Sequence, residues 1–121
     1  MITRVAGAIL AVGDQDVMAA FFVDGLGFTK TTDAEMWPGA RWVELAPPGG
    51  GTSVVLNAAK DFGREPDAGY PMTFACADLE ATAAELRAAG LAVRGPVVED
   101  WGSYVEVTDP EGRKLLVRAG E

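Results

Sequence analysis

The sequence contains no histidine and a single cysteine, and both shortages restrict the chemistry available to the chain. Without an imidazole, a Ser-His-Asp mechanism is excluded, and the usual nitrogen ligand for zinc, iron, nickel and copper is missing. One thiol cannot form an internal disulfide. The apolar neighbours Phe74 and Leu79 predict that Cys76 is a buried structural residue rather than a reactive one.

Basic residues and long hydrophobic runs are also scarce. Ten Lys and Arg against 18 Asp and Glu give a net charge of −8, whereas binding to nucleic acid needs a basic face for phosphates. No stretch approaches the ~20 apolar residues of a membrane span. The apolar run from Val5 to Val12 ends at Asp14 without a good cleavage site, so it resembles a strand more than a signal sequence. We expect a cytoplasmic protein with neither nucleic acid nor a membrane as partner.

The sequence contains the same pattern of predicted strands and helix twice. In each copy an apolar strand leads to a capping aspartate, Asp14 or Asp78, then to a helix that closes at a glycine, and then to three more strands. The expected strands of the first copy are Arg4–Val12, Phe28–Thr32, Arg41–Leu45 and Ser53–Asn57, with a helix that is capped by Asp14, runs through Phe22 and closes at the Gly25-Leu26-Gly27 turn. Those of the second copy are Met72–Cys76, Leu91–Val93, Tyr104–Val107 and Lys114–Arg118, with a helix that is capped by Asp78, carries Leu79, Ala83 and Leu86 on one face and stops at Gly90.

Two such copies predict an α+β fold made of two β-α-β-β-β repeats. Neither repeat can bury its sheet alone, so we expect a curled mixed sheet around a cleft, with the helices on the outer face. The first module is placed at residues 1–58 and the second at residues 70–121. The polar stretch 59–69, which contains Pro66 and Gly69, reads as the linker within one compact domain.

The order of several short motifs resembles the vicinal oxygen chelate superfamily, which includes glyoxalase, bleomycin-resistance and extradiol dioxygenase families. The likeness runs over nearly the whole chain and is specific to the superfamily, not to one activity. Its carriers are Val12-Gly13-Asp14, Ala20-Phe21-Phe22, Leu26-Gly27-Phe28, Arg41-Trp42-Val43-Glu44, Thr73-Phe74 with Asp78, Trp101-Gly102, and Thr108-Asp109-Pro110-Glu111-Gly112.

The resemblance also implies where metal ligands would stand. Metal-dependent members hold a divalent ion with His and Glu side chains on the first and last strands of both repeats. The matching positions here are Gly7, Val55, Pro71 and Leu116. None of these side chains can coordinate a metal, so we expect no cofactor. The open alternative is a harder ion held by Glu44 and Glu106, although such carboxylates are more often solvated or paired with Arg and Lys.

Alternate residues of a strand point to the same face of a sheet, so the four ligand positions also indicate which of their neighbours face the cleft. It predicts a pocket with aromatic walls, an apolar floor and a few carboxylates. The register of the strands that carry Trp42 and Tyr104 is the weakest step, because a slip of one residue reverses the faces. Trp37 and Trp101 are placed in loops near strand ends. The expected ligand-binding residues are Ile9, Trp42, Glu44, Val55, Asn57, Trp101, Tyr104, Glu106 and Leu116.

Two functions are compatible with such a pocket. The first is a metal-free binding protein of the bleomycin-resistance kind, which sequesters an aromatic or cationic drug or metabolite. The alternative is a metal-independent lyase, isomerase or dioxygenase relative in which Glu44 or Glu106 serves as the general base. The resemblance also implies a homodimer, with each cleft formed either within one chain or across two chains.

Overall fold

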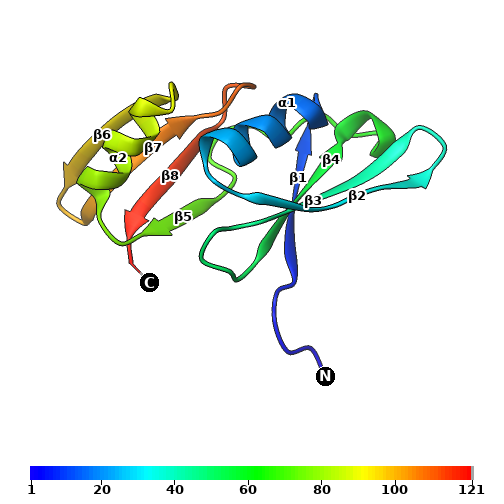
Figure 1. Ribbon diagram of the computed structural model, residues 1–121, viewed down its shortest axis with the longest axis horizontal. Coiled ribbons are helices and arrows are strands. Elements are labelled where there is room, and N and C mark those ends of the chain that lie inside the picture. Colours follow the sequence, from blue (N-terminus) through cyan, green and yellow to red (C-terminus); the bar gives the residue numbers. More distant parts are fainter. Residues whose placement is uncertain (121) are drawn as a thin grey trace. The chain divides into compact units, whose positions relative to one another are not determined.

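A computed structural model of the protein describes residues 1–120. The chain divides into two compact units, Met1–Asp67 and Ala68–Glu121. Each unit contains one four-stranded mixed sheet and one α-helix, in the order predicted from the repeated pattern (Figure 1). The α+β class and the β-α-β-β-β order of both repeats are therefore confirmed.

The first unit orders its strands β1-β4-β3-β2, with β1 and β4 parallel and the other pairs antiparallel. A short π-helix, η1, continues α1, and a 3-10 helix, η2, follows β4. The elements are β1 Gly7–Val12, α1 Gln15–Ala20, η1 Phe21–Gly25, β2 Thr29–Trp37, β3 Ala40–Ala46, β4 Ser53–Ala58 and η2 Ala59–Phe62.

The second unit repeats that arrangement, with the order β5-β8-β7-β6 and a parallel pair formed by β5 and β8. Its helix lies against β6, β7 and β8. The elements are β5 Thr73–Cys76, α2 Leu79–Ala88, β6 Ala92–Glu99, β7 Gly102–Thr108 and β8 Lys114–Ala119.

Both helices begin where the sequence predicts. The carboxylate of Asp14 accepts a hydrogen bond from the Val17 backbone N–H at 3.0 Å, and that of Asp78 accepts one from Ala81 at 2.9 Å. Each aspartate satisfies one of the N–H groups that a helix leaves unpaired at its first turn. The same local signal therefore sets the start of the helix in both repeats.

Alternation along the strands separates a helix-covered face from a helix-free face in each sheet. In the first unit Val43, Leu45 and Leu56 are fully buried, as are Met18 of α1 and Phe22 of η1. In the second unit the corresponding buried residues are Val105, Val107, Leu115 and Val117, with Ala83 and Leu86 of α2. This burial puts Val43, Leu45, Val105 and Val107 on the helix side, which leaves the alternate residues of β3 and β7 on the helix-free face.

Several element boundaries differ from the prediction. The strands β2 and β6 run on to Trp37 and Glu99, so Trp37 ends a strand instead of lying in a loop. Both are edge strands. The residues of β2 are largely polar and exposed, and β6 is interrupted by Gly95-Pro96, so neither forms a continuous apolar run. The first strand starts at Gly7, and Cys76 is only half-buried.

The stretch expected as a linker, residues 59–69, contains η2 and a contact back to β1. Asp67 accepts a hydrogen bond from the Ala11 N–H at 2.8 Å, and its own N–H donates to the Ala11 carbonyl at 2.9 Å. These two bonds occupy the free edge of β1 and assign Asp67 to the first unit. Among the described residues, no helix is both long and apolar enough to cross a membrane.

Candidate functional site

The helix-free face of the first unit carries one row of side chains that crosses three strands. Ile9 of β1 pairs with Val55 of β4, and Val55 pairs with Glu44 of β3. Paired residues in a sheet point to the same side, so these three lie next to one another. Ile9 is 52% exposed, whereas Val55 is 2% exposed, so the row contains one exposed and one buried apolar side chain next to Glu44.

Trp42 and Glu44 are directly joined on this face. The indole Nε1 of Trp42 donates a hydrogen bond to Oε1 of Glu44 at 2.9 Å. Residues two apart in a strand share a face, and this bond is possible only if both side chains point the same way. The sequence left open which face of β3 carries Trp42 and Glu44. Their hydrogen bond, together with the pairing of Glu44 with Val55, places both side chains on the helix-free face.

Asn57 lies two residues beyond Val55, on the same face of β4. It is 6% exposed, and its Oδ1 atom is buried without a hydrogen-bond partner among the residues that the structure describes. Close by, β3 and β4 are bridged from the helix side, where Nε2 of Gln15 donates to the carbonyls of Arg41 and Leu56 at 2.9 and 2.7 Å. Almost all buried polar groups in proteins have a partner, so Asn57 is an exception that needs an explanation.

The second unit has the equivalent row. Thr73 of β5 pairs with Leu116 of β8, Leu116 with Glu106 of β7, and Glu106 with Arg94 of β6. Glu106 therefore occupies the place in the second sheet that Glu44 occupies in the first. The register of β7 thus also matches the face predicted for Tyr104 and Glu106.

Glu106 is surrounded by donors. Its side chain is only 10% exposed, and its carboxylate lies 3.6 Å from Nη1 of Arg94 and 3.9 Å from Nζ of Lys114. The Tyr70 hydroxyl donates to Oε2 of the same carboxylate at 3.5 Å. A hydrogen bond to Tyr104 and the nearby charge of Glu106 raise the pKa of Arg94. A buried carboxylate needs such partners, and here two cations and a phenol supply them.

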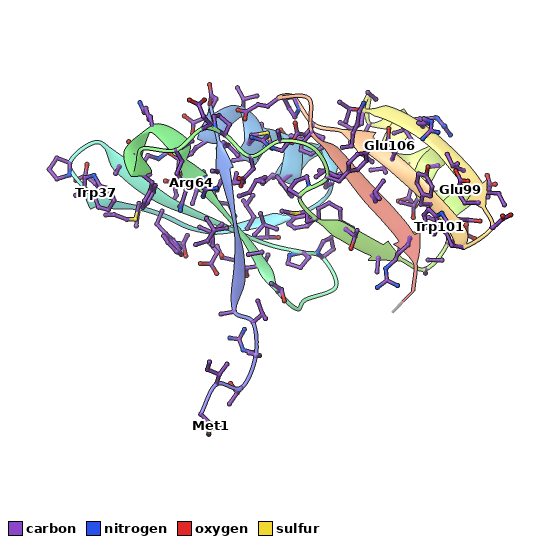
Figure 2. The ribbon with its side chains drawn as sticks, turned by 180° about the vertical axis from the view of Figure 1, so that it is seen from behind. Met1, Trp37, Arg64, Glu99, Trp101 and Glu106 are labelled. Carbon is purple, nitrogen blue, oxygen red and sulfur yellow. The ribbon has the colours of Figure 1, made fainter. Side chains whose placement is uncertain are left out.

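An aromatic pair borders this charged cluster. The rings of Trp101 and Tyr104 are stacked, with centroids 5.4 Å apart and an interplanar angle of 5°. The Tyr104 hydroxyl lies 3.5 Å from Nη1 of Arg94, and Trp101 remains 72% exposed. Figure 2 shows the Trp101 and Glu106 side chains in the second unit, where Trp101 lies in the turn that leads into β7 and Glu106 lies on β7 itself.

Trp37 has a different setting. It packs edge-to-face on Phe62 of η2, with ring centroids 5.6 Å apart, at the end of the β2–β3 hairpin (Figure 2). Both rings remain more than two-fifths exposed. Trp37 was not among the expected ligand-binding residues, and its contact with Phe62 gives it a packing role within the first unit.

The four positions where relatives would hold a metal do not fit an ion. Gly7 and Val55 lie on neighbouring strands of the first unit, where a Cβ atom added to Gly7 would meet Cγ2 of Val55 at 3.4 Å. Pro71 and Leu116 offer only hydrocarbon in the second unit. Across residues 1–120, no group of three or more His, Cys, Asp and Glu side chains is placed to hold a metal.

Sequence reasoning missed two residues of the second unit. Arg94 lies beyond the short strand expected at residues 91–93, and Tyr70, the first residue of the expected second module, was given no role in the site. Continuing the alternation from Ala92 would have placed Arg94 on the face of Glu106, because their strands are paired there. Tyr70 precedes β5 and has no periodic signal that would have revealed its contact with Glu106.

Comparisons with known proteins agree with this fold. Residues 2–117 match the model of the Glyoxalase/Bleomycin resistance protein/Dioxygenase superfamily. The chain is 27% identical over 119 residues to the uncharacterized protein YetH of Bacillus subtilis, covering 98% of this chain and 99% of that one.

Two solved structures are similar over almost their whole length. A superfamily member from Sphaerobacter thermophilus is 29% identical with a TM-score of 0.87, covering 98% of both chains. TnmS3, an antibiotic binding protein from Streptomyces sp. CB03234, is 29% identical with a TM-score of 0.84, covering 99% of this chain and 98% of its own. With its repeated fold and a family match that spans nearly every residue, the chain belongs to the glyoxalase/bleomycin resistance protein/dioxygenase superfamily.

Proposed function

We propose that the protein binds an organic small molecule with an aromatic ring on the helix-free faces of its sheets, without a metal. The expected binding residues are those predicted from the sequence, with Arg94, Lys114 and Tyr70 added around Glu106. An antibiotic or a metabolite of similar chemistry is the class of ligand. The relative TnmS3, which is described as an antibiotic binding protein, supports this class.

The observation that carries the proposal is the exposed aromatic stack beside a buried charged group. Trp101 lies in the turn before β7 with most of its ring in solvent, and its stacking on Tyr104 makes a contiguous aromatic surface of the kind that can contact a ligand. A planar ligand stacked on such a pair gains ~0.5–1.5 kcal/mol per ring pair beyond the burial of its area. Area burial of about 25 cal/mol per Å² then brings micromolar affinity, roughly 8 kcal/mol, within reach.

Tryptophan fluorescence offers a direct test. Titration with a panel of aromatic and glycopeptide antibiotics is expected to quench the emission of the wild-type chain in a saturable way. The variants Trp42→Phe and Trp101→Phe should each lose part of that response. Trp37→Phe is the matched control, because Trp37 packs on Phe62 and is not a proposed contact. A panel that leaves the wild-type fluorescence unchanged would remove the main support for binding.

Catalysis by a glutamate is the second candidate, and one observation favours it. Glu106 is a nearly buried carboxylate that faces the Tyr70 hydroxyl, so a proton acceptor and a hydroxyl lie together. In this case a ligand that quenches fluorescence should also be converted, and Glu106→Gln should abolish the conversion while binding persists. Mass spectrometry and NMR spectroscopy of the ligand after incubation together distinguish the two functions. An isomerisation changes the NMR spectrum without changing the mass, whereas a ligand unchanged by both methods favours sequestration.

We also propose a homodimer as the assembly in which the ligand is bound. The family resemblance supports it. Size-exclusion chromatography with light scattering measures the mass directly. A single species with the mass of one chain at micromolar concentration would contradict the dimer without affecting the binding proposal.

A further inference from the structure

Two buried side-chain amides in the first unit have opposite surroundings. Gln15 is 8% exposed and donates two hydrogen bonds from Nε2, to the carbonyls of Arg41 and Leu56. Asn57 is 6% exposed, yet its Oδ1 accepts no hydrogen bond. An unsatisfied buried acceptor costs about 1–3 kcal/mol, so a purely structural residue at this position would be apolar. Asn57 therefore keeps a destabilising group at the proposed binding face.

A second acceptor lies diagonally across the same face. Glu44 is paired with Val55, two residues before Asn57, which puts the Cα atoms of Glu44 and Asn57 roughly 7–8 Å apart. One carboxylate oxygen of Glu44 accepts the Trp42 indole N–H. Among residues 1–120 no donor contacts the other oxygen, so the carboxylate keeps capacity for another hydrogen bond.

The described strand residues around these two acceptors supply no positive charge. Of the strand residues that the register places on this face, within the described chain, none is Lys or Arg. The row next to Glu44 contains Ile9, Val55 and Thr32. The nearest strand cation, Arg41, alternates to the other side, where it binds Asp33 and Asp16. Glu44 is thus a carboxylate without a cationic partner beside an amide oxygen without a donor.

We propose that Asn57 and Glu44 form a subsite for the protonated amine of an aromatic ligand whose ring lies on Trp42. An ammonium group supplies three donors and one positive charge, and hydrogen bonds of about 2.8 Å to each acceptor let one nitrogen lie between them. Because Oδ1 of Asn57 is buried, binding requires the amide to rotate about its Cβ–Cγ bond until the oxygen reaches the nitrogen. This inference rests on the proposed function and specifies its ligand.

Three probes with the same naphthalene ring distinguish an ammonium subsite from binding of the ring alone. Naphthalene-2-methylammonium carries the donor and the positive charge, 2-ethylnaphthalene carries neither, and naphthalene-2-acetate carries a negative charge. Quenching of tryptophan emission by the full-length protein gives a dissociation constant for each. The wild-type chain is expected to bind the ammonium probe at least about tenfold more tightly than 2-ethylnaphthalene.

Variants then assign the preference to the two residues. Asn57→Leu and Glu44→Gln should each reduce the preference for the ammonium probe by about tenfold, with 2-ethylnaphthalene little affected. Asn57→Leu should also raise the melting temperature, because it removes the unsatisfied acceptor. Gln15→Leu is the matched control, since it removes a buried amide whose hydrogen bonds are made. It should lower the melting temperature and leave the ratio of the two affinities unchanged.

The outcomes are distinct. Binding of all three probes with equal affinity, or an ammonium preference that survives in both Asn57→Leu and Glu44→Gln, overturns the subsite and leaves the proposed binding function standing. No quenching by any probe at millimolar concentration overturns both. An Asn57→Leu variant that is less stable than the wild type also contradicts the inference, because it means that the amide is satisfied in solution.

Discussion

The two repeats share one topology, but their helix-free faces have different chemistry. In the first, Glu44 accepts an indole N–H and Asn57 has an unsatisfied oxygen. In the second, Glu106 lies at the equivalent position between Arg94 and Lys114. The comparison shows that strand order and register place Glu44 and Glu106 at equivalent positions. The side chains on the neighbouring strands then determine which ligand groups each carboxylate can bind. We infer that the first face prefers donors and the second tolerates anions.

The turns that follow the third strand of each repeat differ in a similar way. In the second unit, Asp109 accepts hydrogen bonds from the N–H groups of Glu111 and Arg113, and its Oδ2 lies 3.0 Å from Nη1 of Arg113. Burial alone would lower the pKa of Arg113, but its hydrogen bonds to Glu111 and Asp109 raise it. In the first unit, the turn at residues 47–50 has a backbone bond from Gly50 to Pro47.

The largest expected effect tests this difference in turns. Arg113→Ala leaves Asp109 buried without its cation, and both side chains are at most 2% exposed. Breaking such a pair typically costs about 3–5 kcal/mol of unfolding free energy. Urea unfolding followed by circular dichroism measures the loss. Pro48→Ala in the exposed link of the first unit is the control, with an expected change below about 0.5 kcal/mol. Equal losses in the two variants would remove the contrast between the turns.

An effect of intermediate size tests the difference between the two helix-free faces in their affinity for an anionic ligand. Arg94→Gln should weaken binding of naphthalene-2-acetate by about three- to tenfold, because it removes one of the two cations beside Glu106. Affinity for the ammonium probe should not fall. Arg4→Gln on the exposed N-terminal arm is a control with the same change in net charge. If both variants weaken the acetate probe equally, the effect comes from overall charge and not from the second face.

The smallest expected effect concerns the helix-covered side of the first sheet. Hydrogen bonds from Arg41 and Lys30 lower the pKa of Asp33 from 3.8 to about 2. The ionised form is favoured in the folded state, so its stabilisation is present above pH 4 and is lost as the pH falls toward 2. Because the pair is partly exposed, the contribution is at most about 1 kcal/mol. Asp33→Asn should flatten the fall in melting temperature over that range, and an unchanged pH profile would contradict the assignment.

Much of the fold could be predicted because its signals are local. Asp14 and Asp78 mark the helix starts, and the alternation around Val43 and Val105 gives the buried side of each sheet. The edge strands β2 and β6 could not be bounded in this way, since β2 is largely polar and exposed and Gly95-Pro96 interrupts the alternation of β6. The contacts of Glu106 with Arg94 and Tyr70 depend on register between distant segments, which composition does not encode.

The most direct test of metal-free ligand binding at the helix-free faces is the spectrum of the three indole N–H groups of uniformly ¹⁵N-labelled protein during titration with naphthalene-2-methylammonium, in buffer containing a metal chelator. We predict that the signal of Trp42 shifts in a saturable manner, that the signal of Trp101 responds when naphthalene-2-acetate is used instead, and that Trp37 stays in place with both. Shifts confined to Trp37, or no shift until metal is restored, would contradict the account.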